Sequence, residues 1–166
     1  MTHGYPMKIL ISGQHGQVSR ELQRCLGAVG ELIVSGRDQM DLAHPDQIRQ
    51  QVQRVRPDLI INAAAYTAVD LAESEPEAAL AINGIAPGIF AEEALALGIP
   101  LIHYSTDYVF DGSKPEPYTE EDAPNPLGVY GQSKLAGERA ITQVQGQHLI
   151  LRTSWVYSTH GKNFLL

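Results

Sequence analysis

Five short apolar runs recur along the chain and predict β-strands. They are rich in Ile, Leu and Val, and they cover residues 8–12, 31–35, 58–62, 100–105 and 148–152. The middle of each run is nearly continuous in apolar residues instead of alternating. This pattern is typical of parallel strands that helices cover on both faces of the sheet.

The segments between these runs have the spacing of helices. Gly84 and Pro87 should kink or interrupt the longest of them, which is rich in alanine. Strands that alternate with helices predict right-handed βαβ units, and therefore an α/β fold with a Rossmann-type, doubly wound parallel sheet. The predicted helices cover residues 17–26, 45–55, 77–97 and 130–145.

Composition narrows the class of protein. The chain has 166 residues, enough for one domain with its own core, and 43% of them are hydrophobic. A net charge of −7 does not favour nucleic acid or an anionic membrane as a partner. One cysteine allows no internal disulfide, and we expect no run of the roughly 20 apolar residues that span a bilayer. Residues 1–6 lack the apolar stretch of a signal peptide and should form a disordered tail, so a cytoplasmic enzyme is expected.

A glycine turn follows the first predicted strand and precedes the first predicted helix. Gly13 and Gly16 would let the backbone approach a pyrophosphate, whose charge the free N–H groups of the helix would meet. Ser19 stands where a third glycine is usual, and its small side chain should be tolerated. Two glycines alone indicate only a turn, but their place between strand and helix favours a dinucleotide site for NADPH or NADH.

The end of the second strand bears on which cofactor is preferred. Arg37 could pair with a 2′-phosphate, and no acidic residue stands directly at the strand tip, which favours NADPH. Asp38 or Asp41 could still reach a ribose hydroxyl, and Arg37 could equally be a solvated surface side chain.

A tyrosine and a lysine four residues apart predict a catalytic pair. Tyr130 and Lys134 would share one face of the last helix, where the ammonium should lower the pKa of the phenol. Such a phenol could give a proton to a carbonyl oxygen while a hydride reaches the carbon. Thr106, at the tip of the fourth strand, could hydrogen-bond the same oxygen, beside Asp107.

Two further features have two interpretations each, and the histidines have one. Residues 63–65 are alanines, which would let the backbone approach an adenosine or simply form a tight junction. Trp155 is either a core anchor or a platform for a sugar. His15 and His103 have no metal-ligand spacing, so we predict no metal site.

Six motifs together resemble the dTDP-4-dehydrorhamnose reductase family of the extended short-chain dehydrogenase/reductase superfamily. The most discriminating is the Ser-Thr-Asp-Tyr-Val-Phe run at 105–110. The others are Gly-x-x-Gly-Gln-Val at 13–18, Asn-Ala-Ala-Ala-Tyr-Thr-Ala-Val-Asp at 62–70, Ser-Glu-Pro-Glu at 74–77, Tyr-Gly-x-x-Lys-x-x-Gly-Glu at 130–138 and Arg-Thr-Ser-Trp-Val-Tyr at 152–157.

The resemblance implies reduction of the 4-keto group of a dTDP-sugar with NADPH or NADH, often in a homodimer. It implies three catalytic residues, Thr106, Tyr130 and Lys134, and a substrate contact from Thr106, Asp107 and Trp155. The residues that it implies, or that the motifs above predict, for the cofactor site are Gly13, Gly16, Gln17, Val18, Arg37, Asp41, Leu42, Ala64, Ala65, Tyr66, Tyr104 and Lys134.

The chain departs from the family's pattern by ending at residues 163–166, so it is expected to be truncated before the C-terminal substrate-binding domain and to turn over poorly alone. Two other functions stay open. A related sugar-nucleotide epimerase or dehydratase shares these motifs, although a dehydratase would want a second acid where Tyr108 stands. A non-catalytic nucleotide-binding regulatory module would keep the pocket, although it has no need of Tyr130 and Lys134.

Overall fold

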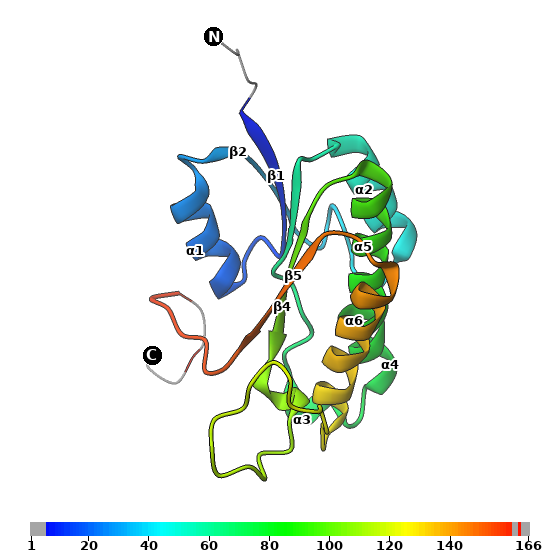
Figure 1. The fold of residues 1–166 in the computed structure, drawn as a ribbon. Coiled ribbons are helices and arrows are strands. Elements are labelled where there is room, and N and C mark those ends of the chain that lie inside the picture. Colours follow the sequence, from blue (N-terminus) through cyan, green and yellow to red (C-terminus); the bar gives the residue numbers. More distant parts are fainter. Residues whose placement is uncertain (1–5, 161–162, 164–166) are drawn as a thin grey trace.

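The protein is described by a computed structural model that covers residues 6–160 and residue 163. Its centre is one sheet of five parallel strands in the order β2-β1-β3-β4-β5 (Figure 1). Each strand boundary lies within one residue of the predicted one, because the apolar runs are bounded by polar or turn-forming residues. The strands are β1 (Met7–Ser12), β2 (Gly30–Ser35), β3 (Leu59–Asn62), β4 (Leu101–Thr106) and β5 (His148–Thr153).

The helices also follow the prediction, with one element added and one divided. The expected helix over 77–97 is α4 (Pro76–Leu80) and α5 (Ala86–Leu97), joined by the π-helical turn η1 (Ala81–Ile85) that contains Gly84. The predicted interruption is therefore confirmed, whereas the short α3 (Val69–Ala72) was not predicted. The remaining helical elements are α1 (Gln17–Leu26), α2 (Pro45–Val55), the 3₁₀ turn η2 (Asp107–Val109) and α6 (Val129–Val144).

Helices lie on both faces of the sheet, as a doubly wound fold requires (Figure 1). Alternate strand residues point to opposite faces: Leu10 packs towards α2, α5 and α6, while Ile9 and Ile11 pack towards α1. All three side chains are at most 1% exposed. The apolar runs are therefore continuous because both faces of the central strands are buried, as predicted.

The α1 face is less completely covered at β5. Leu149 of β5 is 51% exposed, so the predicted coverage on both faces does not hold for this strand. The physical reason is position, because β5 is at the edge of the sheet opposite β2, and α1 packs over the other end.

One helical stretch passes the length and composition test for a membrane span, contrary to the expectation of no such run. It is Pro76–Leu97, and more than half of its most apolar part is buried inside the protein. Side chains such as Phe90 and Ala94 lie in the main core against α2 and the sheet. Its apolar character therefore has an ordinary explanation as a core helix.

The strand order determines where a ligand can sit. From β1 the chain crosses to β2 on one side and later returns to β3 on the other, so the connections after β1 and β3 diverge. In open parallel sheets such a switch point leaves a crevice outside the carboxyl ends of the strands. The turn after Ser12 and the turn after Asn62 border this crevice.

Candidate active site

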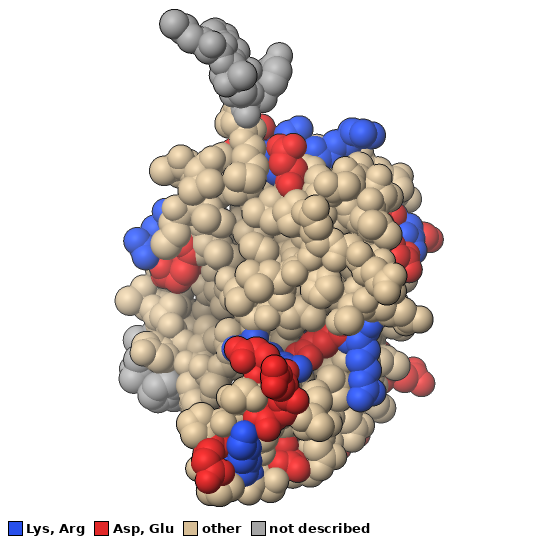
Figure 2. All heavy atoms as spheres, in the orientation of Figure 1, with Lys and Arg blue, Asp and Glu red and all other residues tan. Residues whose placement is uncertain are grey.

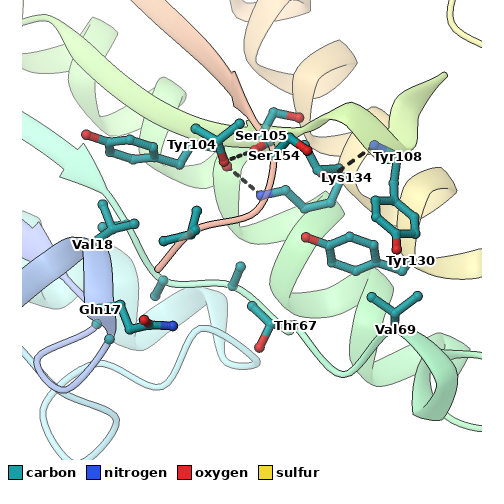
Figure 3. A pocket seen from close by; sticks show the side chains of 18 of the residues that line it. Gln17, Val18, Thr67, Val69, Tyr104, Ser105, Tyr108, Tyr130, Lys134 and Ser154 are labelled. Carbon is teal, nitrogen blue, oxygen red and sulfur yellow. Dashed lines mark hydrogen bonds between the residues drawn. The ribbon is translucent and has the colours of Figure 1, made fainter. Parts of the chain in front are cut away.

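A cleft of about 730 Å³ lies at the carboxyl ends of the strands (Figure 3). It brings together most of the residues that the sequence singled out, although they come from the ends of all five strands and from α1, η2 and α6. Those that line it are Gly13, Gly16, Gln17, Val18, Arg37, Ala64, Ala65, Tyr104, Thr106, Asp107, Tyr130, Lys134 and Trp155.

The glycine turn is held tightly between β1, β2 and β3. Gly13 has a φ of +88°, and a Cβ placed on it would lie 3.0 Å from the Cβ of Ala64. Its N–H donates to Ser35 O at 2.9 Å, which ties the turn to the end of β2. The left-handed conformation and the close approach of Ala64 together explain why glycine is needed here.

The first turn of α1 points its positive end into the cleft. Gly16 is the N-cap residue and contributes no side-chain cap, so no capping side chain stands between this end of the helix dipole and the cleft. Ser19, which replaces the usual third glycine, is fully buried, and its Oγ accepts a hydrogen bond from Gln23 Nε2 at 3.3 Å. The expectation that serine fits at this position is confirmed.

A second hollow of about 390 Å³ continues the cleft past Gly13 and Ala64. It contains the other three predicted cofactor residues, Asp41, Leu42 and Tyr66, together with Arg37. The Arg37 side chain is 80% exposed, and its Nε lies 3.1 Å from Asp41 Oδ2. Burial raises the pKa of Asp41, but hydrogen bonds from Ala43 N–H and Arg37 outweigh it, so the pKa falls below its ordinary value.

The amine of Lys134 contacts strand β4. Its Nζ donates to Tyr104 O at 2.6 Å (Figure 3). The same Nζ lies 3.5 Å from His103 Nε2. The side chain is only 2% exposed, and burial lowers its pKa from 10.5 to about 8, although Glu138 opposes the shift.

Tyr130 behaves differently from the expectation. Burial raises its pKa above 10.0, Thr106 opposes this by hydrogen bonding, and the charges of Asp107 and Tyr108 raise it further. The prediction that the pKa of Tyr130 is lowered is therefore wrong, because burial of the phenol has the largest effect. The Tyr108 ring packs edge-on against Tyr130 with centroids 5.6 Å apart.

The tips of β4 and β5 are joined across the cleft. Asp107 accepts hydrogen bonds from Thr106 Oγ1 at 3.2 Å and from Ser154 Oγ at 2.8 Å. Trp155, the next residue, has a φ of +52° and is 75% exposed. The interpretation of Trp155 as a core anchor is wrong, and its exposed ring borders the cleft instead.

A buried ion pair supports this end of the sheet. Glu138 of α6 accepts two hydrogen bonds from the guanidinium of Arg152 on β5, at 3.0 and 2.7 Å, and one from Ser105 Oγ on β4. Arg152 also lies over the ring of Phe110 at 4.9 Å. Two motifs that the sequence presented separately, at 130–138 and 152–157, are thus one structural unit.

The segment between η2 and α6 forms a side wall with a further hollow of about 570 Å³, lined partly by Tyr108, Leu127 and Trp155. Asp111 organises it by accepting from Asn125 Nδ2, Ser113 N–H and Oγ, and Tyr118 OH, and these bonds hold its pKa well below the ordinary value.

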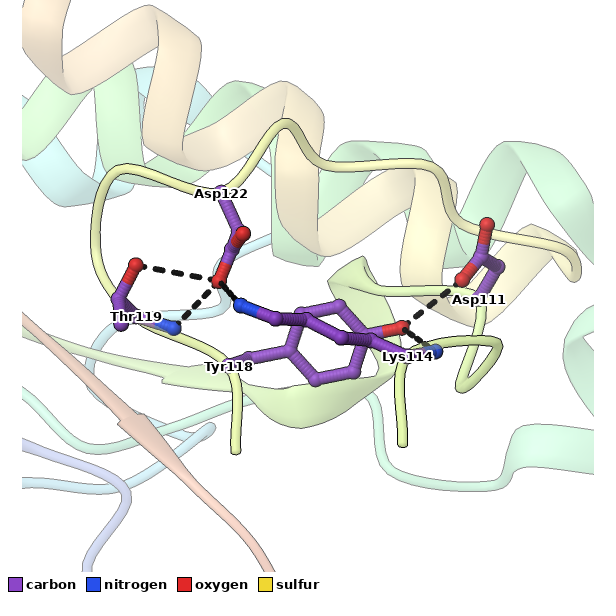
Figure 4. A network of polar contacts seen from close by, with 5 residues as sticks. All are labelled: Asp111, Lys114, Tyr118, Thr119 and Asp122. Carbon is purple, nitrogen blue, oxygen red and sulfur yellow. Dashed lines mark hydrogen bonds and ion pairs between the residues drawn. The ribbon is translucent and has the colours of Figure 1, made fainter. Parts of the chain in front are cut away.

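Lys114 and Asp122 pair at 2.7 Å over the same segment, as the close-up shows (Figure 4). Charges of both signs gather at this end of the face in Figure 2, while the middle of that face is uncharged.

Two groups of contacting residues were not predicted. Asn83, in the π-helical turn, bonds both Tyr66 N–H and Tyr66 O at 2.9 Å and also donates to Ser133 Oγ. Beneath the cleft, Asn62 and His103 are buried next to one another. These contacts could have been predicted from the presence of polar residues in otherwise apolar strands and helices.

The described residues contain no group of three or more His, Cys, Asp or Glu side chains placed to hold a metal ion. The helical spacing of Val18, Leu22, Cys25 and Leu26 predicts that Cys25 packs in the core, and this prediction is wrong because Cys25 is exposed. The structure does not describe residues 1–5, so the predicted tail lies outside the described residues except for Pro6.

Comparison with known proteins shows the family of the chain. A family model described as "RmlD substrate binding domain" matches residues 7–166. The chain belongs to this family. A dTDP-4-dehydrorhamnose reductase from Escherichia coli (strain K12) is 50% identical over 162 residues, and one from Burkholderia thailandensis is 48% identical over 159. These matches cover 95% and 96% of this chain but only 54% and 53% of the relatives.

A solved structure gives the same result for the fold. The dTDP-4-dehydrorhamnose reductase from Bacillus anthracis, in complex with NADP, superimposes with a TM-score of 0.93 at 38% identity, over 96% of this chain and 57% of that one. The family resemblance and the doubly wound parallel fold are therefore confirmed. The chain spans about half the length of the curated relatives that it matches.

Proposed function

We propose that this chain binds NADPH or NADH and contributes the catalytic residues for reducing the 4-keto group of dTDP-4-dehydrorhamnose, which yields dTDP-L-rhamnose. The observation that carries the proposal is the convergence of Thr106, Tyr130 and Lys134 in one cleft with the Gly13 turn. Relatives and a neighbouring structure named for this reaction support the substrate.

The cleft fits a dinucleotide in shape and chemistry. Gly13 and Gly16 keep side chains away from the N-terminal end of α1, whose dipole and backbone suit a pyrophosphate. Ala64 and Ala65 keep the facing wall low, and the hollow with Asp41, Leu42 and Tyr66 continues from it. A nicotinamide cofactor supplies the hydride when it is bound.

The chain's own residues supply the proton for the carbonyl oxygen and orient the sugar. Tyr130 OH gives its proton to the carbonyl oxygen of the sugar as negative charge develops there, and Thr106 Oγ1 donates a hydrogen bond to the same oxygen. The raised pKa of Tyr130 keeps the phenol protonated near neutral pH, in agreement with an acid. Asp107 and Trp155 face the sugar from the tips of β4 and β5.

Arg37 is proposed to select NADPH over NADH. Its exposed guanidinium lies beside the hollow that receives the adenosine end, and a fork of N–H donors matches a phosphate. The pairing with Asp41 orients the side chain and also offers a carboxylate to a ribose hydroxyl, so the preference is expected to be moderate.

The first test is binding of the cofactor to this chain. Titration with NADPH and separately with NADH, followed by nicotinamide fluorescence, should give saturable curves with the tighter one for NADPH. If neither binds, the proposal that this chain contains the cofactor site is overturned.

The second test is Tyr130→Phe in a chain that continues as the curated relatives do. We expect reduction of the dTDP-sugar to fall by about 10²- to 10⁴-fold while NADPH affinity is kept. Tyr157→Phe is the matched control, because Tyr157 lies outside the main cleft. Unchanged reduction in Tyr130→Phe would overturn the assignment of Tyr130 as the acid. No reduction by the unmodified extended chain would favour the regulatory module, and epimerised or dehydrated product would favour the related sugar-nucleotide enzymes.

A further inference from the structure

A row of buried polar side chains crosses the sheet directly beneath the cleft. Ser12, Asn62 and His103 occupy paired register positions on β1, β3 and β4, and each is 1% exposed. Buried polar groups are costly unless they are hydrogen-bonded, so the partners of this row are closely constrained. The proposed function uses none of these three side chains.

The bonds along the row run in one direction. Ala64 N–H donates to Ser12 Oγ at 3.1 Å, and Ser12 Oγ donates to Asn62 Oδ1 at 2.7 Å. The amide nitrogen of Asn62 therefore faces His103 Nδ1, at 3.1 Å. Because an amide nitrogen only donates, Nδ1 of His103 accepts, and its ring proton is on Nε2.

The other end of the imidazole meets the proposed catalytic lysine. His103 Nε2 lies 3.5 Å from Lys134 Nζ, and the acceptor that this amine uses inside the protein is Tyr104 O, at 2.6 Å. Burial and the nearby lysine hold the pKa of His103 well below its ordinary value, so the ring stays neutral. A neutral ring that carries its proton on Nε2 cannot accept a hydrogen bond from the ammonium there.

We propose that His103 is a positioning residue that withholds an acceptor from Lys134, so that the remaining N–H groups of the lysine are directed into the cleft for a ligand hydroxyl. The role given to His103 rests on the proposed function, because the ligand hydroxyl belongs to that function. The test of the inference does not depend on it. The row also links Ala64, which packs against Gly13, to Lys134, so the turn and the lysine share one support.

The other charged and titratable groups around Lys134 do not take over the role of His103 in withholding an acceptor from the ammonium. Glu138 on the same helix favours the ammonium, but two hydrogen bonds commit it to Arg152 of β5. On β4, Tyr104 offers its backbone oxygen, and in η2 Asp107 acts on Tyr130. Tyr130, on the next turn of α6, borders the same cleft.

The test measures the histidine and the lysine directly in the chain without cofactor or substrate. Long-range ¹H–¹⁵N NMR reports which ring nitrogen of His103 carries the proton. The ¹³Cε signals of the lysines, of which the chain has four, report the pKa of Lys134. We expect an Nε2–H tautomer throughout the neutral range and a Lys134 pKa of about 8.

Two variants form a matched pair. His103→Gln can face Asn62 with its oxygen and Lys134 with its N–H, so it should keep the lysine pKa low. His103→Asn reaches Asn62 but ends short of Lys134, so no N–H faces the ammonium and the lysine pKa should be higher than in His103→Gln.

An Nδ1–H tautomer in the unmodified chain overturns the proposal, as does a Lys134 pKa that is equal in the two variants. If His103→Asn does not fold, the tautomer and the comparison of His103→Gln with the unmodified chain still decide. None of these signals depends on turnover or cofactor binding, so a failure of the proposed reductase function would be seen separately.

Discussion

The two ends of the cleft are built in different ways. The glycine side, which comprises Gly13, Gly16, Gly36 and Ala64 at the tips of β1 to β3, is made of closely approaching backbone. The aromatic side, which comprises Tyr108, Phe110, Tyr130 and Trp155 near the tips of β4 and β5, is made of large side chains.

Exposure separates the two sides further. On the aromatic side Tyr108 is 53% exposed and Trp155 is 75% exposed, whereas Ser12 and Asn62 beneath the glycine side are 1% exposed. A wall of backbone changes little when a ligand arrives, whereas exposed rings have surface available to a ligand or to another part of a protein. We therefore expect substitutions on the glycine side to affect folding and cofactor affinity, and those on the aromatic side to affect the sugar substrate.

The largest effect should come from adding a methyl group at Gly13. Gly13→Ala forces a left-handed φ on alanine and brings its Cβ 3.0 Å from Ala64, so the free energy of unfolding should fall by about 2 kcal/mol or more. Gly16→Ala is the control, because its Cβ would meet only Gly13 O at 3.5 Å, and the loss should be at most about 1 kcal/mol. Denaturant unfolding measures both; equal losses would contradict the close packing described for the glycine side.

A smaller effect is expected from the electrostatics of the same side. Arg37→Ala should weaken NADPH binding by about tenfold and leave NADH binding unchanged, because only NADPH offers a 2′-phosphate. Arg24→Ala, which removes an exposed arginine from α1, controls for the loss of one positive charge. Fluorescence titration measures both cofactors, and equal weakening for both would exclude a 2′-phosphate contact.

The junction between the two sides should be sensitive to pH. Burial has lowered the pKa of Lys134 from 10.5 to about 8, so the ammonium predominates below pH 8 and is lost as the pH rises through that value. If the ammonium donates to the ribose of the cofactor, affinity should decrease above pH 8, by up to about tenfold per pH unit. Isothermal titration at several pH values measures this, and Lys134→Met should abolish the dependence; a flat profile for the unmodified protein would refute the contact.

The smallest effect is expected on the aromatic side. Asp111→Ala removes the acceptor for Asn125, Tyr118 and Ser113, so the side wall should loosen and KM for the dTDP-sugar should rise several-fold. NADPH affinity should stay the same, since the Gly13 turn is made by other strands. Steady-state kinetics on a chain that continues as the relatives do, with Glu116→Gln as the control in the same segment, would show whether the two sides are independent.

Local patterns were sufficient for the elements and for part of the site. The five strands and the main helices follow from apolar periodicity, because burial on both faces leaves a continuous apolar run at each strand. Gly13 was recognisable because its left-handed backbone requires glycine whatever else surrounds it. The predicted homodimer and cytoplasmic location remain predictions.

Other features depended on contacts between distant residues. The direction in which Lys134 points could not be predicted from its spacing to Tyr130, because its acceptor, Tyr104 O, is 30 residues away on β4. The pKa of Tyr130 was predicted in the wrong direction because burial, which raises it, also depends on residues far away in the chain. The exposure of Trp155 likewise depends on what packs beyond β5, which its local sequence does not describe.

The sequence by itself determined the doubly wound sheet, the glycine turn and the identities of the residues at the strand tips, since these follow from periodicity and from local backbone requirements. Only the tertiary structure decided that Ser12, Asn62, His103 and Lys134 meet in one row and that the lysine amine is held by β4. The physical reason is that strand register and burial set hydrogen-bond partners and pKa values, and both arise from residues far apart in the chain.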